Sequence, residues 1–229
     1  MKTIEVIIMN AFARDSGGGN PAAIVTNADG LTNPEKQAIS KKLGLSETAF
    51  VSHSSVADYK LEFFTPTKQI AHCGHATIAA FSYLRESGVI KKDILTNETT
   101  DGLREIRFIN GRAFMEQKSP AFSYPSDADA ETILRSVNIK SDDLPVGTRP
   151  VIVNTGNSFL LIEVRSERAL MHAKPHLDLI SRVSEAYGLI GFYMFYRDSS
   201  GSSHATTRMF APLYGIEEEA ATVMAAGPL

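Results

Sequence analysis

The sequence carries two versions of one pattern, and an internal repeat restricts the folds that a chain can adopt. In the first version Phe64-Thr65-Pro66 precedes Ala76-Thr77-Ile78-Ala79-Ala80, and in the second Phe210-Ala211-Pro212 precedes Ala221-Thr222-Val223-Met224-Ala225. The Ala-Thr pair follows the proline after ten residues in the first version and after nine in the second. Landmarks that match at nearly the same spacing favour a duplication. We therefore expect two lobes of one kind, residues 1–120 and 121–229, with the functional site between them.

Hydrophobic periodicity favours the α+β class. In the first lobe we expect strands over residues 4–12, 21–27, 47–52, 59–64, 92–96, 103–109 and 112–118, and helices over 34–43 and 74–86. The second helix is apolar almost all round and should be buried. Thr32 and Glu35 have capping-box spacing at the start of the first helix, with Asn33 as a rival cap, and Gly44 ends it. Asn110-Gly111 predicts a hairpin.

The second lobe repeats this order after a linker at 119–129. We expect helices over 130–137 and 176–187, strands over 150–154, 159–164, 190–197 and 204–210, a connection at 198–201 and a second buried helix from Glu218. Only four residues follow Ala225, so the second lobe is expected to lack its closing strands. Because exposed sheet edges are unfavourable, either a partner supplies the missing surface or the chain is a shortened version of a longer one.

Composition excludes several classes of protein. The 229 residues have a net charge of −3 and no cluster of basic residues, so no nucleic-acid partner is expected. No apolar run approaches the roughly 20 residues of a membrane helix, and the apolar N-terminus, broken by Glu5, does not fit a signal peptide. A single cysteine excludes an intrachain disulfide and fits a reducing compartment. We expect a soluble, cytoplasmic protein without a membrane partner.

Three residues are candidates for chemistry, and each has an ordinary structural alternative. Cys73 lies at a helix start, where the dipole lowers the pKa of a thiol and could make it a base, but a lone cysteine is also a common small core residue. His75, in the first turn, is either functional or a satisfied core histidine. Glu47 heads an apolar strand that would disfavour its charged form, as suits a proton carrier, although most glutamates face solvent. His72 fits a structural role.

Other common sites have no signature in the sequence. His72 and His75 are three residues apart, but no third ligand follows at a recognisable spacing, so no metal site is expected. Gly17-Gly18-Gly19 does not form a dinucleotide-binding fingerprint, and no nucleophile elbow is present. The run Glu217-Glu218-Glu219 is typical of the first turn of a helix, where acidic groups complement the dipole.

At these residues the chain resembles the PhzF family, the phenazine-biosynthesis-like isomerases with the diaminopimelate epimerase-like fold. The matching elements follow one another in order, from about residue 8 to the end of the chain: Asn10-Ala11-Phe12, Gly19-Asn20-Pro21-Ala22-Ala23, Leu45-Ser46-Glu47-Thr48-Ala49-Phe50-Val51, Phe64-Thr65-Pro66, Cys73-Gly74-His75-Ala76-Thr77, Thr155-Gly156, Leu160-Leu161, Arg208, Phe210, Pro212 and Gly215. The most specific part of the resemblance is the pair of elements Ser46-Glu47-Thr48-Ala49-Phe50-Val51 and Cys73-Gly74-His75-Ala76-Thr77, in this order and at this separation.

The resemblance implies two lobes, each a β-barrel-like sheet around a central helix, usually in a homodimer. It implies that Glu47 is the general acid/base, assisted or oriented by His75, and that no cofactor takes part. A small carboxylated substrate would be held by Gly74 and neighbouring N–H groups. By the same resemblance, Cys73, Asn20, Glu219 and Thr222 would contribute to substrate binding.

The second version of the repeat departs from the family pattern. Where the family typically reads Glu-Asp-Pro-Ala-Thr-Gly-Ser-Ala, this chain has Glu218-Glu219-Ala220-Ala221-Thr222-Val223-Met224-Ala225. The branched side chain at Val223 hinders close approach of a ligand to the helix start, and Met224 lacks the hydroxyl. Two hypotheses follow: a cofactor-independent isomerase, or a shortened non-catalytic relative that binds a small anion or a protein. A racemase with two cysteines is disfavoured, because the second lobe contains no cysteine.

Overall fold

The computed structural model describes residues 3–13, 17–197, 204–220 and 222–229. The middle of the loop expected at 13–20, most of the connection expected at 198–201 and the landmark Ala221 lie outside these residues. The chain divides into two compact units, Met1–Gln117 and Lys118–Leu229.

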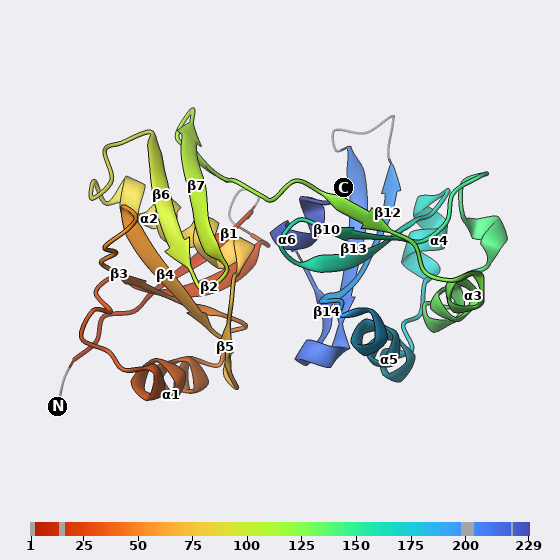
Figure 1. Cartoon of the computed structure of the whole chain (residues 1–229), viewed down its shortest axis with the longest axis horizontal. Helices are drawn as coiled ribbons and strands as arrows, with labels where there is room; N and C mark the ends of the chain where they lie inside the picture. The colour runs from red at the N-terminus through yellow and green to blue at the C-terminus, as the bar shows by residue number, and fades with distance from the viewer. Residues whose placement is uncertain (1–2, 14–16, 198–203, 221) are drawn as a thin grey trace. The chain divides into compact units, whose positions relative to one another are not determined.

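The N-terminal unit contains one curled sheet and two α-helices among its described residues (Figure 1). Its sheet has the strand order β1-β2-β3-β4-β6-β7-β8, and β5 pairs with β4. The elements are β1 (Ile7–Ala11), β2 (Asn20–Val25), α1 (Asn33–Leu43), β3 (Thr48–Ser52), β4 (Tyr59–Phe64), β5 (Gln69–Ile70), α2 (Gly74–Glu86), β6 (Ile94–Thr99), β7 (Gly102–Ile109) and β8 (Arg112–Met115).

The helix α2 forms the centre of this unit. It contacts β1, β2, β3 and β8, and the strands curl around it. Ala76, Ala80 and Phe81 are fully buried in the main hydrophobic cluster. The small residues let the helix approach the strands closely, and burial of its apolar faces removes them from water. The predicted buried helix is confirmed, with the expected bounds.

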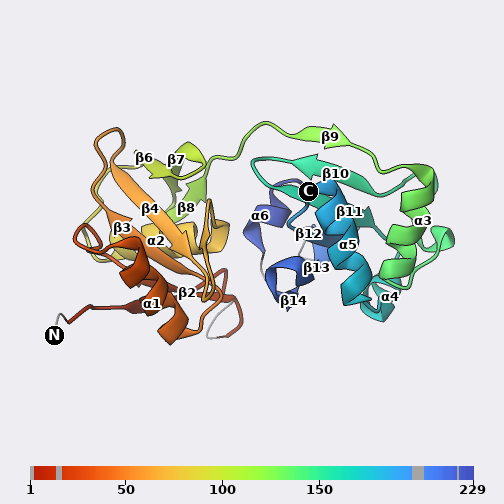
Figure 2. The same ribbon diagram turned by 60° about the horizontal axis from the view of Figure 1, so that its bottom comes forward.

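The helix α1 covers the other side of the sheet (Figure 2). Thr32 caps it: its side chain accepts a hydrogen bond from the Glu35 backbone, and Glu35 bonds back to the Thr32 backbone. Gly44 ends it in the left-handed region at φ 68°. A buried ion pair between Lys36 and Glu62 joins this helix to β4. The capping box and the terminating glycine are both confirmed.

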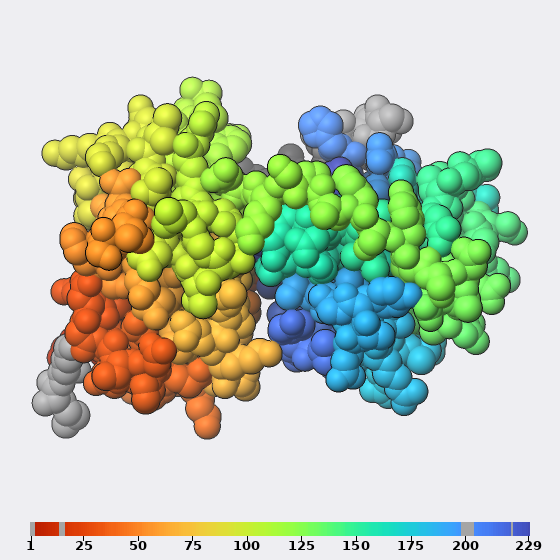
Figure 3. All heavy atoms as spheres, in the orientation of Figure 1, coloured from red at the N-terminus to blue at the C-terminus, as the bar shows by residue number. Residues whose placement is uncertain are grey.

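The predicted hairpin joins β7 and β8. Asn110 and Gly111 have φ values of 51° and 77°, as a tight turn between two twisted strands requires. The strands β6 and β7 lie on the face of the unit shown in Figure 3. In β7, Leu103 and Ile109 are about half exposed.

The C-terminal unit has a second curled sheet with the order β14-β13-β12-β11-β10-β9. Its elements are β9 (Ala121–Ser123), α3 (Asp127–Ser136), β10 (Val151–Asn154), β11 (Ser158–Glu163), α4 (Glu167–His172), α5 (Leu177–Tyr187), β12 (Gly191–Arg197), β13 (Ala205–Ala211), β14 (Ile216–Glu219) and α6 (Val223–Ala226), with short 3₁₀ turns at Ser141–Asp143 and Pro212–Tyr214. Phe192, Ile162 and Phe210 are fully buried in its own core.

The two units repeat one pattern of strand pairing. In the first, β1 pairs antiparallel with β2, β2 parallel with β3, and β3 and β5 both antiparallel with β4. The same sequence of antiparallel and parallel pairs relates β10, β11, β12, β13 and β14. The helices α2 and α6 follow at equivalent places, after β5 and β14. The predicted α+β class with two similar curled sheets is confirmed. No helix in the described part of the chain is long and apolar enough to span a membrane.

Several expectations for the second lobe are wrong. The expected linker at 119–129 contains β9, which pairs with β10, and the first turn of α3. Glu217-Glu218-Glu219 belongs to a strand because β14 pairs with β13, and the last helix begins at Val223 instead of Glu218. The helix α4 was not expected. Pairing with a neighbouring strand and bonds to Arg208 outweigh the local preference of three glutamates for a helix start.

Candidate active site

Glu47 lies directly before β3 and is buried, with 6% of its surface exposed. Its backbone oxygen accepts a hydrogen bond from the Ala23 amide at 3.2 Å, which continues the parallel pairing of β2 with β3. Val51 and Phe50, later in the strand, are also buried. The carboxylate is therefore inside the unit, and the solvent-facing alternative for Glu47 is wrong.

The start of α2 provides two more buried side chains. Cys73 is the N-cap residue, with extended backbone, and His75 is in the first turn; 6% and 4% of these residues are exposed. The Cys73 carbonyl accepts bonds from the Thr77 amide at 3.1 Å and the Thr77 hydroxyl at 2.6 Å. These bonds fix the first turn, and with it the directions of the Cys73 and His75 side chains.

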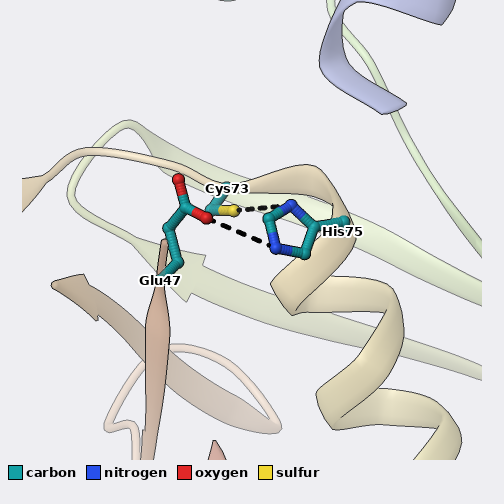
Figure 4. A group of neighbouring side chains, drawn as sticks. All are labelled: Glu47, Cys73 and His75. Atoms are coloured by element: carbon teal, nitrogen blue, oxygen red, sulfur yellow. Dashed lines mark hydrogen bonds and ion pairs between the residues drawn. The ribbon is translucent and has the colours of Figure 1, made fainter. Parts of the chain in front are cut away.

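The imidazole of His75 contacts both other groups. Its Nε2 lies 3.3 Å from Oε2 of Glu47, and its Nδ1 lies 3.5 Å from Sγ of Cys73. Figure 4 shows the carboxylate and the thiol on the same side of the ring, each meeting a different nitrogen. Glu47 precedes Cys73 by 26 positions, yet the three side chains form one chain of contacts, from carboxylate through imidazole to thiol.

Asn20, the first residue of β2, also contacts His75. Its amide Nδ2 lies 3.3 Å from Nδ1, and both residues are buried. The preceding Gly19 has φ 80°, and a Cβ there would lie 2.5 Å from the Ala11 carbonyl oxygen, so only glycine fits this turn into β2. An amide nitrogen only donates, so Nδ1 accepts and the neutral ring carries its proton on Nε2, toward Glu47.

Two further residues of this region differ in kind. Gly74, the first residue of α2, is buried beside these side chains, at the positive end of a 13-residue helix. His72 packs edge-on against Phe63, with ring centroids 5.9 Å apart. This aromatic contact gives His72 a packing role, in line with the structural reading of the sequence.

The predicted residues of the second half-site lie in the C-terminal unit. The Thr222 hydroxyl donates a hydrogen bond to the Glu219 carboxylate, and both residues are partly exposed. Glu219 ends β14, and Thr222 is the N-cap of the short helix α6. Met224, the residue in place of the family's serine, is buried. Glu219 and Thr222 thus contact each other within the C-terminal unit.

Sequence reasoning missed two features. The ligand atoms of Glu47, Cys73 and His75 lie within 4.8 Å of one another, which is a possible metal-binding group. Metal-ligand spacing along the chain could not reveal this group, because the carboxylate lies directly before β3 and the other two ligands lie at the start of α2. A hollow of about 410 Å³ in the C-terminal unit is lined by residues around α4, including Arg165, Arg168 and His172. It was missed because α4 was not predicted.

Two curled sheets with the same strand pairing, the first of them wrapped around a buried helix, define the class of diaminopimelate epimerase-like folds. Within that class, the family model of the phenazine biosynthesis-like proteins matches residues 9–229 of this chain. The chain therefore belongs to the PhzF family, and several relatives of the chain are named as uncharacterized isomerases.

Named relatives agree with this assignment. An uncharacterized isomerase of Clostridium acetobutylicum is 35% identical over 96% of this chain and 76% of its own. The crystal structure of a PhzF-family phenazine biosynthesis protein of Bacillus anthracis superposes with a TM-score of 0.88 at 32% identity, over all of this chain and 79% of that one. A hydroxyproline epimerase of Agrobacterium vitis shares the fold alone, with a TM-score of 0.54 at 13% identity, over 94% of this chain and 72% of that one.

Proposed function

We propose that the protein is an isomerase that moves a carbon-bound proton in a small carboxylated substrate without a cofactor. Glu47 is the general acid/base, and His75 orients it. The observation that carries this proposal is the buried Glu47 carboxylate, 3.3 Å from the Nε2 atom of His75. Burial disfavours the charged carboxylate and the imidazole N–H favours it, a balance that suits a group that takes and then gives a proton.

The proposed reaction needs one proton carrier. The ionised Glu47 takes the proton from a carbon of the substrate, and the electron pair of that C–H bond moves into the conjugated system of the substrate. The carboxylic acid then returns the proton to another carbon, so the substrate is neither oxidised nor reduced. Through Nε2–H, His75 stabilises the carboxylate before and after the cycle, and Asn20 holds the ring in this tautomer.

The start of α2 is the proposed anchor for the substrate. The N–H groups around Gly74 and the positive end of the helix dipole favour a carboxylate there. Cys73 and Asn20 border the same place. Glu219 and Thr222 remain proposed substrate contacts on the family resemblance alone. On the same basis we propose a homodimer in the cytoplasm, with no nucleic-acid or membrane partner.

Proton exchange in D₂O, followed by NMR, tests the proposal. A panel of cyclic and linear amino and hydroxy acids, including a dihydro-hydroxyanthranilate-type compound, is incubated with wild type, Glu47→Gln and Glu86→Gln. Glu86 is exposed in the last turn of α2, and its substitution removes the same charge away from the site. We expect deuterium to enter a carbon position with wild type and Glu86→Gln, and about 10²–10⁴-fold more slowly with Glu47→Gln.

Exchange that is unchanged in Glu47→Gln would overturn the role of this residue and point to Cys73 and His75. Absence of exchange with wild type across the panel would favour the alternative, a non-catalytic family member that binds a small anion or a protein. The substitutions at Val223 and Met224 are the observation behind that alternative, because they alter the second version of the motif.

A further inference from the structure

Glu47, Cys73 and His75 present three different kinds of metal ligand at one place. A carboxylate oxygen, a thiol sulfur and an imidazole nitrogen lie within 4.8 Å of one another, and all three side chains are buried. We propose that this group binds a zinc ion, and that zinc thereby blocks the same carboxylate to which the proposed function assigns proton transfer.

Two pairs of ligand atoms have the separation found in a zinc site, each pair at a different nitrogen of the His75 ring. Zinc binds sulfur at about 2.3 Å and nitrogen or oxygen at about 2.0–2.1 Å, so in a tetrahedron sulfur and nitrogen are roughly 3.6 Å apart and nitrogen and oxygen roughly 3.3 Å. Here Sγ of Cys73 is 3.5 Å from Nδ1, and Oε2 of Glu47 is 3.3 Å from Nε2. A metal uses only one of the two ring nitrogens. The three ligand atoms are at most 4.8 Å apart, so binding requires one side chain to move its ligand atom closer to the other two.

The chemistry of the ligands selects the metal. A thiolate with an imidazole favours zinc over magnesium or calcium, which prefer all-oxygen sites. Three protein ligands leave a fourth position for water or an anion, as in zinc sites that exchange ligands. On binding, the S–H bond of Cys73 breaks, its proton goes to solvent, and a sulfur–zinc bond forms. The ring proton of His75 moves from Nε2 to Nδ1, which leaves the Nε2 lone pair for zinc. A turn of the Asn20 amide would offer its oxygen to Nδ1–H, the usual second partner of a zinc-bound histidine.

Cobalt(II) in place of zinc gives a direct readout. A sulfur-to-cobalt charge-transfer band in the near ultraviolet reports a thiolate ligand, and Cys73 is the only cysteine of the chain. We expect wild type to develop this band at one cobalt per chain and to lose it when zinc is added. Cys73→Ser should lose the band. Glu47→Gln and His75→Gln should need a higher cobalt concentration for half-saturation, whereas His172→Gln, at an exposed histidine of the other unit, should match wild type.

Circular dichroism and thermal melting first establish that each variant is folded. If Cys73→Ser does not fold, the proposal is tested by the band of wild type and by the cobalt concentrations that Glu47→Gln and His75→Gln need for half-saturation. The proposal is overturned if reduced wild type shows no band, or if both of these variants titrate as wild type does. The titration contains no substrate, so its failure leaves the isomerase proposal standing, and failure of proton exchange leaves the zinc proposal standing.

Discussion

At the scale of single residues, His75 connects the candidate site. Its two ring nitrogens meet different groups: Glu47 at Nε2, and Cys73 and Asn20 at Nδ1. A neutral imidazole carries one proton, so the group that donates to one nitrogen determines what the other can do. The arrangement makes the Asn20 amide a positioning group for the proton that faces Glu47.

Changing the amide should change the tautomer. In ¹H–¹⁵N spectra of the imidazole we expect His75 of wild type to be protonated at Nε2. In Asn20→Asp we expect a proton at Nδ1, because a carboxylate accepts where the amide donates. Loss of a hydrogen bond worth about 1 kcal/mol should slow proton exchange by about fivefold in Asn20→Ala. Asn33→Asp, the same change at an exposed position, is the control. An identical tautomer in wild type and Asn20→Asp would contradict this assignment.

At the scale of elements, Arg208 ties three parts of the C-terminal unit together. Its guanidinium binds both carboxylate oxygens of Glu218, on β14, at 2.8 and 2.9 Å. It also donates to the carbonyls of Leu170 and Ala173, at the end of α4, at 3.1 and 2.8 Å. Planar bidentate pairing holds an arginine in one orientation. The residue that matched the family motif therefore holds α4 against β13 and β14.

This pair gives the C-terminal unit a dependence on pH. The pKa of Glu218 is lowered, mainly because Arg208 donates hydrogen bonds to the carboxylate. A carboxylate with a depressed pKa in the folded state adds stability that is present above its unfolded pKa of about 4.3, and that is lost as pH falls through the folded value. Glu218→Gln should therefore lower the urea midpoint at pH 7, and this effect should become smaller as the pH falls below about 4.3.

The comparison needs a neighbouring carboxylate as its reference. Glu217→Gln removes an exposed carboxylate one position earlier in the same strand. We expect its urea midpoints to follow those of wild type at every pH. If the difference between Glu218→Gln and wild type does not change between pH 7 and about 3, the ion pair does not contribute the pH dependence.

At the scale of the whole molecule, each unit has a core of its own. Phe81, on α2, is fully buried in the cluster of the N-terminal unit, and Phe192, on β12, is fully buried in that of the C-terminal unit. Each curled sheet wraps its own hydrophobic residues, as the repeated strand pairing requires. The stability of each unit should therefore depend first on its own core.

A reciprocal pair of substitutions tests this independence. Truncation of a buried phenylalanine to alanine costs about 3–5 kcal/mol. In hydrogen exchange followed by mass spectrometry, Phe81→Ala should lower protection mainly within residues 1–117, and Phe192→Ala mainly within 118–229. Each variant is the control for the other. An equal loss of protection in both units from either change would show that the chain unfolds as one cooperative body.

Local sequence signals predicted much of the architecture. The bounds of α2 follow from a long apolar helix that begins at Gly74, and those of α1 from its capping box and Gly44. The matching landmarks predicted the duplication, and the repeated strand pairing agrees with it. The helix bounds depend on neighbouring residues and the duplication on a repeated pattern, and both can be found in the sequence alone. The strand β14 escaped prediction because pairing with β13 and the bonds from Arg208 to Glu218 outweigh the local preference of its glutamates for a helix start.

The candidate site divides in the same way. Its residue types, Glu47 and His75, and its position at the start of a buried helix follow from local patterns and from the family motifs. Only the tertiary structure placed the carboxylate 3.3 Å from the imidazole, turned Nδ1 toward Asn20 and Cys73, and made a possible metal-binding group of residues on separate elements. Contacts between separate elements depend on how sheet and helix pack, and spacing along the chain does not encode those distances.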